Sequence, residues 1–161
     1  MAEKTRKKSS ALRNRVKNSG FEERLRGWLS EGVRIISAEA GHLVHSGTSA
    51  AVLDGSNAFI TQTVTAGKGA RLQFMAHLRG VADLANSPIV IRLRWVDATG
   101  SYLGTGLEIY IPQRQLTTHA WTTLWNVTNA APAGTAGLNV RLDAPYSAGE
   151  AAVVIDDLII I

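Results

Sequence analysis

The sequence predicts an all-β fold: a sandwich of two stacked antiparallel sheets behind a short basic N-terminal arm. Three observations predict it. Short runs with period-two alternation, rich in Val, Ile, Leu and Thr, follow one another along the chain. Gly, Asn, Asp and Pro separate these runs, and no long amphipathic helical pattern interrupts them. With 161 residues, 45% of them apolar, the chain suffices for one domain with a substantial core.

The arm differs from the rest of the chain in charge. Residues 1–17 carry seven Lys or Arg side chains against a single Glu3, so this segment is +6 and the remainder about −2. We therefore divide the chain into an arm, 1–17, and a domain, 18–161. The arm is either a flexible solvated tail or a segment that becomes ordered against neighbouring subunits. It holds no aromatic residue to stack on bases, and the domain is not basic, which argues against nucleic-acid binding.

Nine segments fit the strand pattern in turn: 33–38, 50–53, 58–64, 71–79, 89–96, 106–111, 122–128, 137–143 and 153–161. Two of the turns between them have clear chemistry. Residues 97–100 place Gly where a tight turn needs positive φ, and residues 131–134 join Pro to Gly. Trp28, Trp95 and Trp121 are expected in the core or at its rim, whereas Trp125 is either core or contact surface. Nine strands suit two stacked sheets.

Alternation also predicts a polar face. In segment 89–96, Ile89, Ile91, Leu93 and Trp95 face one way while Arg92 and Arg94 face the other. If the strands concerned are neighbours, one face collects a candidate ligand-binding set: Gln73, His77, Arg92, Arg94, Glu108, Tyr110, Asn139 and Arg141, with Asp143 beside them. Guanidinium, amide and tyrosine groups hydrogen-bond hydroxyls and stack on the apolar face of a sugar. The alternative is an ordinary solvated face with cross-strand ion pairs.

Composition and motifs exclude several classes of protein. No stretch approaches the roughly 20 apolar residues of a membrane helix, and the N-terminus lacks the apolar core of a secretory signal. Cysteine is absent, so neither disulfides nor thiolate metal sites are available. The chain has no nucleophile elbow and no phosphate loop. Its four histidines lack recognisable zinc-ligand spacing, since His42-x-x-His45 has no third ligand nearby in sequence. We expect a protein that is not an enzyme.

Short motifs recur in a fixed order from residue 18 to residue 161. They are Asn18-Ser19-Gly20-Phe21-Glu22, Trp28, the run from His45 to Leu53, Gln62-Thr63-Val64, Trp121, residues 131–134 and Ile155-Asp156-Asp157-Leu158. In this order the chain resembles the galactose-binding-like jelly rolls, which include many carbohydrate-binding modules of polysaccharide-degrading enzymes. The resemblance implies a jelly-roll β-sandwich, and it leaves function to be argued from the site.

A closer resemblance covers residues 80–112. It rests on Leu84-Ala85-Asn86-Ser87-Pro88, Tyr102-Leu103-Gly104 and Ile111-Pro112. These runs resemble a Firmicute domain that typically precedes collagen-type triple-helix repeats in spore-surface or cell-surface proteins. The resemblance implies a spore-surface or cell-surface protein, although the sequence itself gives no compartment. This chain has no Gly-X-Y repeat, so it departs from that pattern where a stalk would begin.

The jelly-roll resemblance also implies a structural calcium ion joining the two ends of the domain. Its ligands would be Glu22 and Asp156, with backbone carbonyls near Ser46 and Ser49, since Ca²⁺ takes six to eight oxygen ligands. If Val154, Asp156 and Leu158 share a face, Asp156 points inward and needs a compensating charge. The alternative to a metal is an ion pair with Arg24 or Arg34. Asn18 either adds a ligand or forms the entry turn.

Two functions remain open. The main hypothesis is a non-catalytic surface or assembly protein, a homo-oligomer in which the jelly roll supplies packing faces and the basic arm reaches a neighbour. The closer resemblance, the arm and the absence of an attached enzyme favour it. The alternative is a carbohydrate-binding module that holds a glycan on the polar face of one sheet. Deleting the arm distinguishes them, because only the first predicts a changed assembly state.

Overall fold

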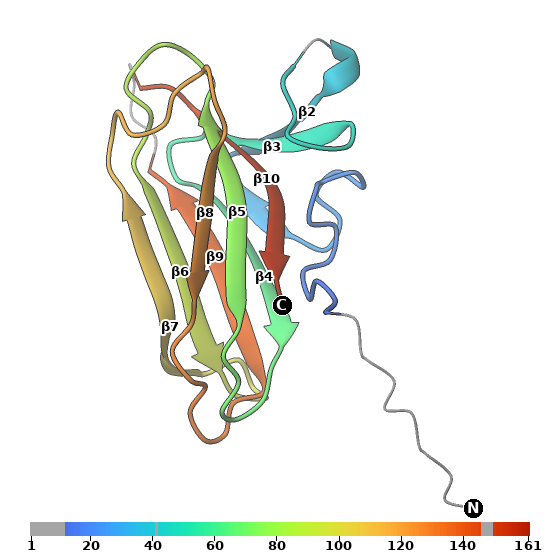
Figure 1. The fold of residues 1–161 in the computed structure, drawn as a ribbon, viewed down its shortest axis with the longest axis vertical. Helices are drawn as coiled ribbons and strands as arrows, with labels where there is room; N and C mark the ends of the chain where they lie inside the picture. The colour runs from blue at the N-terminus through green and yellow to red at the C-terminus, as the bar shows by residue number, and fades with distance from the viewer. Residues whose placement is uncertain (1–11, 41, 146–149) are drawn as a thin grey trace, which may run out of the picture.

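The computed structural model describes residues 12–40, 42–145 and 150–161, and these form a two-layer β-sandwich (Figure 1). Sheet A has the strand order β1-β4-β9-β6-β7, and sheet B has the order β2-β3-β10-β5-β8. The strands are β1 (Leu29–Glu31), β2 (Val33–Ser37), β3 (Ser49–Leu53), β4 (Ala58–Thr65), β5 (Gln73–Gly80), β6 (Ile89–Val96), β7 (Tyr102–Ile111), β8 (Thr122–Val127), β9 (Gly137–Ala144) and β10 (Val153–Ile160), with a 3-10 turn η1 at Ala38–Ala40. All ladders are antiparallel. The predicted fold class is confirmed.

Each of the nine predicted segments contains a strand. The strand that was not predicted, β1, has three residues and none of them is buried, so it offers no alternation to detect. Strand β7 begins at Tyr102, four residues before the predicted start at 106. Gly104 and Gly106 interrupt the alternation of side chains in this stretch. At Gly106 a Cβ would crowd the buried Trp95, at 3.1 Å from its Nε1. The turns at 97–100 and 131–134 are confirmed, with φ of 85° at Gly100 and 83° at Gly134.

The main core lies between the inner faces of the two sheets. On β6 the side chains of Ile91, Leu93 and Trp95 are fully buried while Arg94 is exposed, as alternation requires. The entry segment, residues 18–28, adds Phe21, which is fully buried and packs on Trp28 with ring centroids 5.6 Å apart. Among the described residues, no helix is long and apolar enough to cross a membrane.

The described end of the predicted arm packs against the domain. Arg15 N donates to Ile160 O at 2.8 Å, and the side-chain amide of Asn14 donates to Leu158 O at 3.0 Å. Val16 is buried in the main core. The predicted boundary between residues 17 and 18 therefore falls within the packed chain, and the rest of the arm, 1–11, lies outside the described residues.

Asn18 forms the entry turn, the second of its two predicted roles. Its Nδ2 donates to the carbonyls of Arg24 and Arg26 at 2.8 and 3.0 Å, and its Oδ1 accepts from Glu23 N at 3.0 Å. One side chain thus closes a loop of eight residues.

Replacing Asn18 by Ala is expected to lower the free energy of unfolding by about 1–2 kcal/mol, because three intramolecular hydrogen bonds disappear together. Urea denaturation of the variant and the wild type measures this difference in the free energy of unfolding. Asn126→Ala is the matched control, since within the described part of the chain that side chain bonds only the amide of its neighbour Val127. Equal destabilisation by both changes would contradict the role given to Asn18.

Candidate functional site

The outer face of sheet A carries polar side chains in three rows that cross the strands. Register partners in an antiparallel ladder share a face, so the strand pairings fix each row. The first row, from β7 to β1, is Tyr110, Val90, Asp143, Phe59 and Glu31. The second is Glu108, Arg92, Arg141, Thr61 and Leu29. The third is Thr105, Arg94, Asn139 and Thr63.

Ion pairs connect the first two rows. Asp143 Oδ2 accepts from Arg92 Nη1 at 3.0 Å, and Asp143 Oδ1 accepts from Arg141 Nε at 2.8 Å. Arg92 Nε also lies 3.5 Å from Glu108 Oε2. One carboxylate thus holds two guanidinium groups in fixed positions. The cross-strand ion pairs of the solvated-face alternative are therefore present, although partly exposed pairs of this kind contribute little to stability.

Aromatic side chains accompany these arginines. The Arg141 guanidinium lies over the Phe59 ring, 3.9 Å from its centroid, and Arg94 lies over Tyr102 at 5.7 Å. At the β7 edge of the face, Tyr102 and Tyr110 are 60% and 63% exposed. The face therefore combines exposed aromatic rings with preset hydrogen-bond donors, the two kinds of group that sugars require.

Two hollows lie on this face. One, of about 430 Å³, is lined mainly by the first and second rows: Glu31, Asn57, Ala58, Phe59, Val90, Arg92, Arg141, Asp143 and Pro145. The other, of about 390 Å³, is lined by Lys17, Gly27, Leu29, Thr61, Gln62, Thr63 and Asn139. They are neighbours along β4 and β9. A larger hollow of about 1130 Å³ beside residues 12–18 has no aromatic ring in its lining, so it is a poorer sugar site.

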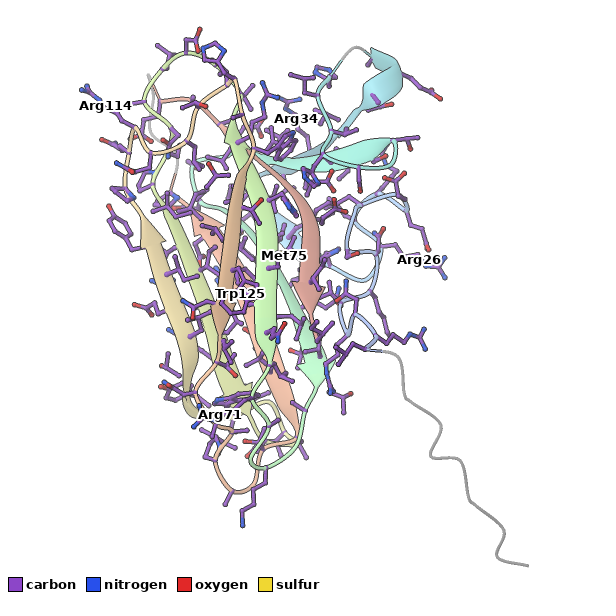
Figure 2. All side chains as sticks on the ribbon, in the orientation of Figure 1. Arg26, Arg34, Arg71, Met75, Arg114 and Trp125 are labelled. Carbon is purple, nitrogen blue, oxygen red and sulfur yellow. The ribbon has the colours of Figure 1, made fainter. Side chains whose placement is uncertain are left out.

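The structure brings together six of the eight predicted ligand residues and separates two. Gln73 and His77 lie on β5, which pairs with β10 and β8 in sheet B. Including them in the polar face is therefore wrong, because alternation assigns a face but does not say which sheet a strand joins. Trp125, 62% exposed on β8 beside Met75, also belongs to the outer side of sheet B (Figure 2).

The sequence-based prediction missed six of the nine residues that line the 430 Å³ hollow: Glu31, Asn57, Ala58, Phe59, Val90 and Pro145. A signal existed for Phe59. Segment 58–64 alternates, and Phe59 has the opposite orientation to the buried Ile60. Only the pairing of β4 with β9, which places Phe59 opposite Asp143, reveals its relevance.

A second polar cluster lies on the outer side of sheet B. Asp156 pairs in register with His77, and the ladder then shifts through a bulge between Asp156 and Ile159. Asp157 adopts a φ of +49° in this bulge, so the carboxyl groups of two successive residues lie near one another. An ideal Cβ on Gly20 would lie 3.4 Å from Asp157 Oδ1, 3.6 Å from Asp156 Oδ1 and 3.9 Å from Glu22 Oε1. We call these three residues the acidic cluster.

The expected inward direction of Asp156 is wrong in one respect. Asp156 is fully buried, but it shares a face of sheet B with its register partner His77. The neighbours of His77 on β5, Ala76 and Leu78, point to the other face, into the main core. Residues of the entry segment and of the loop before β3 therefore cover Asp156. The bulge also puts Leu158 in that core instead of beside Asp156.

Backbone N–H groups surround the two predicted calcium ligands. Asp156 Oδ2 accepts from the amides of His45 and Ser46 at 2.9 and 3.2 Å. Glu22 accepts from the amides of Thr48 and Ser49 and from the Thr48 hydroxyl. The loop before β3 thus presents amides where carbonyl ligands were expected. The alternative ion pair is not seen either: Arg34 pairs with Asp54, and no salt bridge joins Arg24 to the acidic cluster in the described residues.

Burial, nearby charges and hydrogen bonds shift the pKa values of three side chains in this region: Asp156, Glu22 and His77. Burial raises the pKa of Asp156 to about 6, and the Asp157 charge adds to the effect against the hydrogen bonds from Ser46 and His45. The Thr48 hydroxyl lowers the pKa of Glu22. Burial, then the nearby His45, lowers the pKa of His77. Among the described residues, no Lys or Arg pairs with the acidic cluster, and its one ion-pair partner is His45, whose Nδ1 lies 2.6 Å from Asp157 Oδ2.

Several solved structures that share this fold are carbohydrate-binding modules. A family 16 carbohydrate-binding module matches with a TM-score of 0.67 and 19% identity over 92% of this chain and 99% of its own. The CBM22-1 xylan-binding domain of Paenibacillus barcinonensis Xyn10C matches with a TM-score of 0.58 and 17% identity over 88% of this chain and 90% of its own. The shared architecture is the jelly-roll β-sandwich.

The enzymatically active domain of bacteriophage CBA120 tailspike protein 4 matches with a TM-score of 0.70 and 17% identity, over 91% of this chain but 21% of that one. This chain therefore spans about a fifth of the tailspike domain. No protein-family model and no curated protein matches the sequence. Identities this low show the fold alone, and the resemblance to the Firmicute domain stays a prediction.

Proposed function

We propose that the protein is a non-catalytic carbohydrate-binding module that holds a glycan on the outer face of sheet A. The observation that carries this proposal is the 430 Å³ hollow, where two guanidinium groups fixed by one carboxylate lie beside an aromatic ring. The fold likeness to carbohydrate-binding modules supports it. This was the alternative hypothesis of the sequence analysis.

Fixed donors favour sugar binding because little side-chain freedom is lost when the ligand arrives. Asp143 holds Arg92 and Arg141 before any ligand is present. Planar guanidinium groups donate paired hydrogen bonds to vicinal oxygens, while a ring such as Tyr110 offers an apolar surface to the C–H face of a pyranose.

The spacing of the hollows favours an extended ligand. Asp143 in the first row and Asn139 in the third are four residues apart on β9, about 14 Å at the usual rise of an antiparallel strand. One pyranose ring cannot span that distance. We therefore propose an oligosaccharide that occupies both hollows, with its length along β4 and β9.

Binding without hydrolysis is part of the proposal. Glycoside hydrolysis needs two carboxyl groups facing each other across a sugar. Glu108 and Asp143 are both ion-paired with Arg92 between them. Their geometry supports a role in holding arginines in place.

We also propose that the acidic cluster takes the structural calcium ion. Glu22, Asp156 and Asp157 supply hard oxygen ligands with no Lys or Arg paired to them in the described part of the chain. A bound Ca²⁺ would offset their mutual repulsion and tie the entry segment to β10. The homo-oligomeric surface protomer remains a separate prediction, and the described residues offer nothing that favours it over glycan binding.

The proposed function is tested by affinity electrophoresis and calorimetry of the full chain against soluble polysaccharides: xylan, β-glucan, galactan and a uronic-acid-containing polymer. Saturable binding to at least one of them is expected, together with no release of reducing ends on long incubation. If none of these polysaccharides slows the migration of the protein in the gel, the glycan-binding proposal is rejected. Release of reducing ends would reject its non-catalytic part.

A further inference from the structure

Three metal-ligating side chains meet beside the acidic cluster: His45 in the loop before β3, His77 on β5 and Asp157 in the bulge of β10. One ligand atom from each lies within 4.8 Å of the others. His45 Nδ1 is 2.6 Å from Asp157 Oδ2, and the two imidazole rings stack with centroids 3.6 Å apart and planes 17° from parallel. We call this trio the histidine cluster.

His77 has a polar atom without a partner. The residue is 8% exposed, its ring stacks on that of His45, and its buried Nδ1 has no hydrogen-bond partner among the described residues. A buried polar atom of this kind costs about 1–3 kcal/mol if it stays unpaired. A buried imidazole nitrogen without a partner, beside a second imidazole and a carboxylate, is suited to a metal ion.

We propose that the histidine cluster binds a divalent transition metal ion of the zinc class through His45 and His77, at a site that adjoins the acidic cluster and shares Asp157 with it. Imidazole nitrogen is a preferred ligand of Zn²⁺, Cu²⁺ and Ni²⁺, whereas Ca²⁺ takes oxygen ligands. Two nitrogens and one carboxylate oxygen leave a fourth position of a tetrahedral ion to water.

Neighbouring groups support this coordination. The Ser46 hydroxyl donates to Asp157 Oδ1 at 2.8 Å and so orients Oδ2 toward His45. The Trp121 ring packs against the His45 ring in a T-shaped arrangement, with ring centroids 5.4 Å apart. Hydrogen bonds that orient a ligating carboxylate are typical of metal sites.

Binding requires a small change of side-chain geometry. Ligand atoms around a tetrahedral Zn²⁺ are about 3.3 Å apart, so the contact between His45 and Asp157 must lengthen. Stacked rings cannot direct both lone pairs at one point, so one ring must turn. We assign this turn to His45, whose side chain is 32% exposed and sits on a loop, because His77 is held in the sheet.

The spacing of the histidines along the chain predicts no zinc site. His45, His77 and Asp157 come from three distant parts of the chain and meet only through the pairing of β10 with β3 and β5. Spacing within one segment could not reveal them.

The test is calorimetric titration of the full chain with ZnCl₂ alone, in calcium-free buffer, because Ca²⁺ at the acidic cluster would compete for Asp157. One Zn²⁺ per chain is expected to bind, and substitution of Cu²⁺ should give an electron paramagnetic resonance spectrum with nitrogen hyperfine splitting. Absence of saturable Zn²⁺ binding would overturn the proposal.

Variants locate the ion. His45→Gln and His77→Gln should each weaken Zn²⁺ binding by at least about tenfold. His119→Gln is the matched control, because that imidazole is 81% exposed and lies away from the cluster against Asp83. His45 is on a loop, so its variant tests the site even if His77→Gln folds poorly. Unchanged affinity in His45→Gln, or an equal loss in His119→Gln, would place the ion elsewhere and reject this assignment.

Discussion

Arg141→Ala is expected to weaken binding of the best glycan ligand by at least tenfold, about 1.4 kcal/mol. Arg141 occupies the middle of the polar face, over Phe59 and bonded to Asp143, so its removal takes away a paired donor and releases its neighbours. Arginines at the centre of an interface often dominate binding. Calorimetry with the oligosaccharide identified in the panel measures the effect.

The same change should alter stability little. The Arg141 side chain is 37% exposed and its ion pair is of the weak surface kind, so the free energy of unfolding should move by less than about 1 kcal/mol. Arg34→Ala is the matched control, since Arg34 is ion-paired with Asp54 on sheet B. If Arg34→Ala loses as much affinity, the ligand is not on sheet A.

Asp156→Asn is expected to be more stable than the wild type without metal at neutral pH, and less stable than the wild type when Ca²⁺ is present. In chelator, the folded-state pKa of Asp156, about 6, lies above the ordinary aspartate value of 3.8. The stability that this carboxyl contributes is therefore complete below pH 3.8 and lost as pH rises through 6. Metal-free Asp156→Asn should accordingly become more stable relative to the wild type between pH 4.5 and 7.

The quantity to measure is the difference in free energy of unfolding between Asp156→Asn and the wild type at each pH. His77, with its lowered pKa, contributes the opposite slope, because its stability is present above the ordinary value of 6.5 and lost as pH falls. That contribution cancels in the difference. Asp83→Asn, whose aspartate side chain is 75% exposed, should show no such trend.

Calcium should invert the order of the two proteins at pH 7. An ion present at 100 times its Kd stabilises the folded state by about 2.7 kcal/mol, and only the wild type retains the full acidic cluster. Thermal unfolding with and without Ca²⁺ gives the result. An equal gain for Asp156→Asn, or no gain for the wild type, would contradict a calcium ion at Glu22, Asp156 and Asp157.

The positions of strands could be predicted from the sequence wherever one face of the strand is apolar and the other polar. Arg92 and Arg94 alternate with Ile91, Leu93 and Trp95, so their orientation follows from the sequence. Sheet membership does not follow, because β5 shows the same alternation as β6 but lies in the other sheet. That is why Gln73 and His77 were misplaced and Phe59 was missed.

Irregular backbone was the second limit. The resemblance implied Glu22 and Asp156 as calcium ligands, but it did not include Asp157. The bulge that brings Asp157 beside them breaks the period of two on which the face assignment relied. The loop before β3 likewise presents amides rather than carbonyls to those carboxylates. Short-range patterns do not contain such details, since they depend on how distant segments fit together.

The central claim, a glycan on the outer face of sheet A, is tested most directly by NMR. Amide shifts of the ¹⁵N-labelled protein would be followed during titration with the best oligosaccharide of the panel. The account predicts perturbations at Phe59, Thr61, Asn139 and Arg141, with β5 and β8 unchanged. Perturbations centred on Met75 and Trp125, with the β4 and β9 amides unmoved, would contradict it.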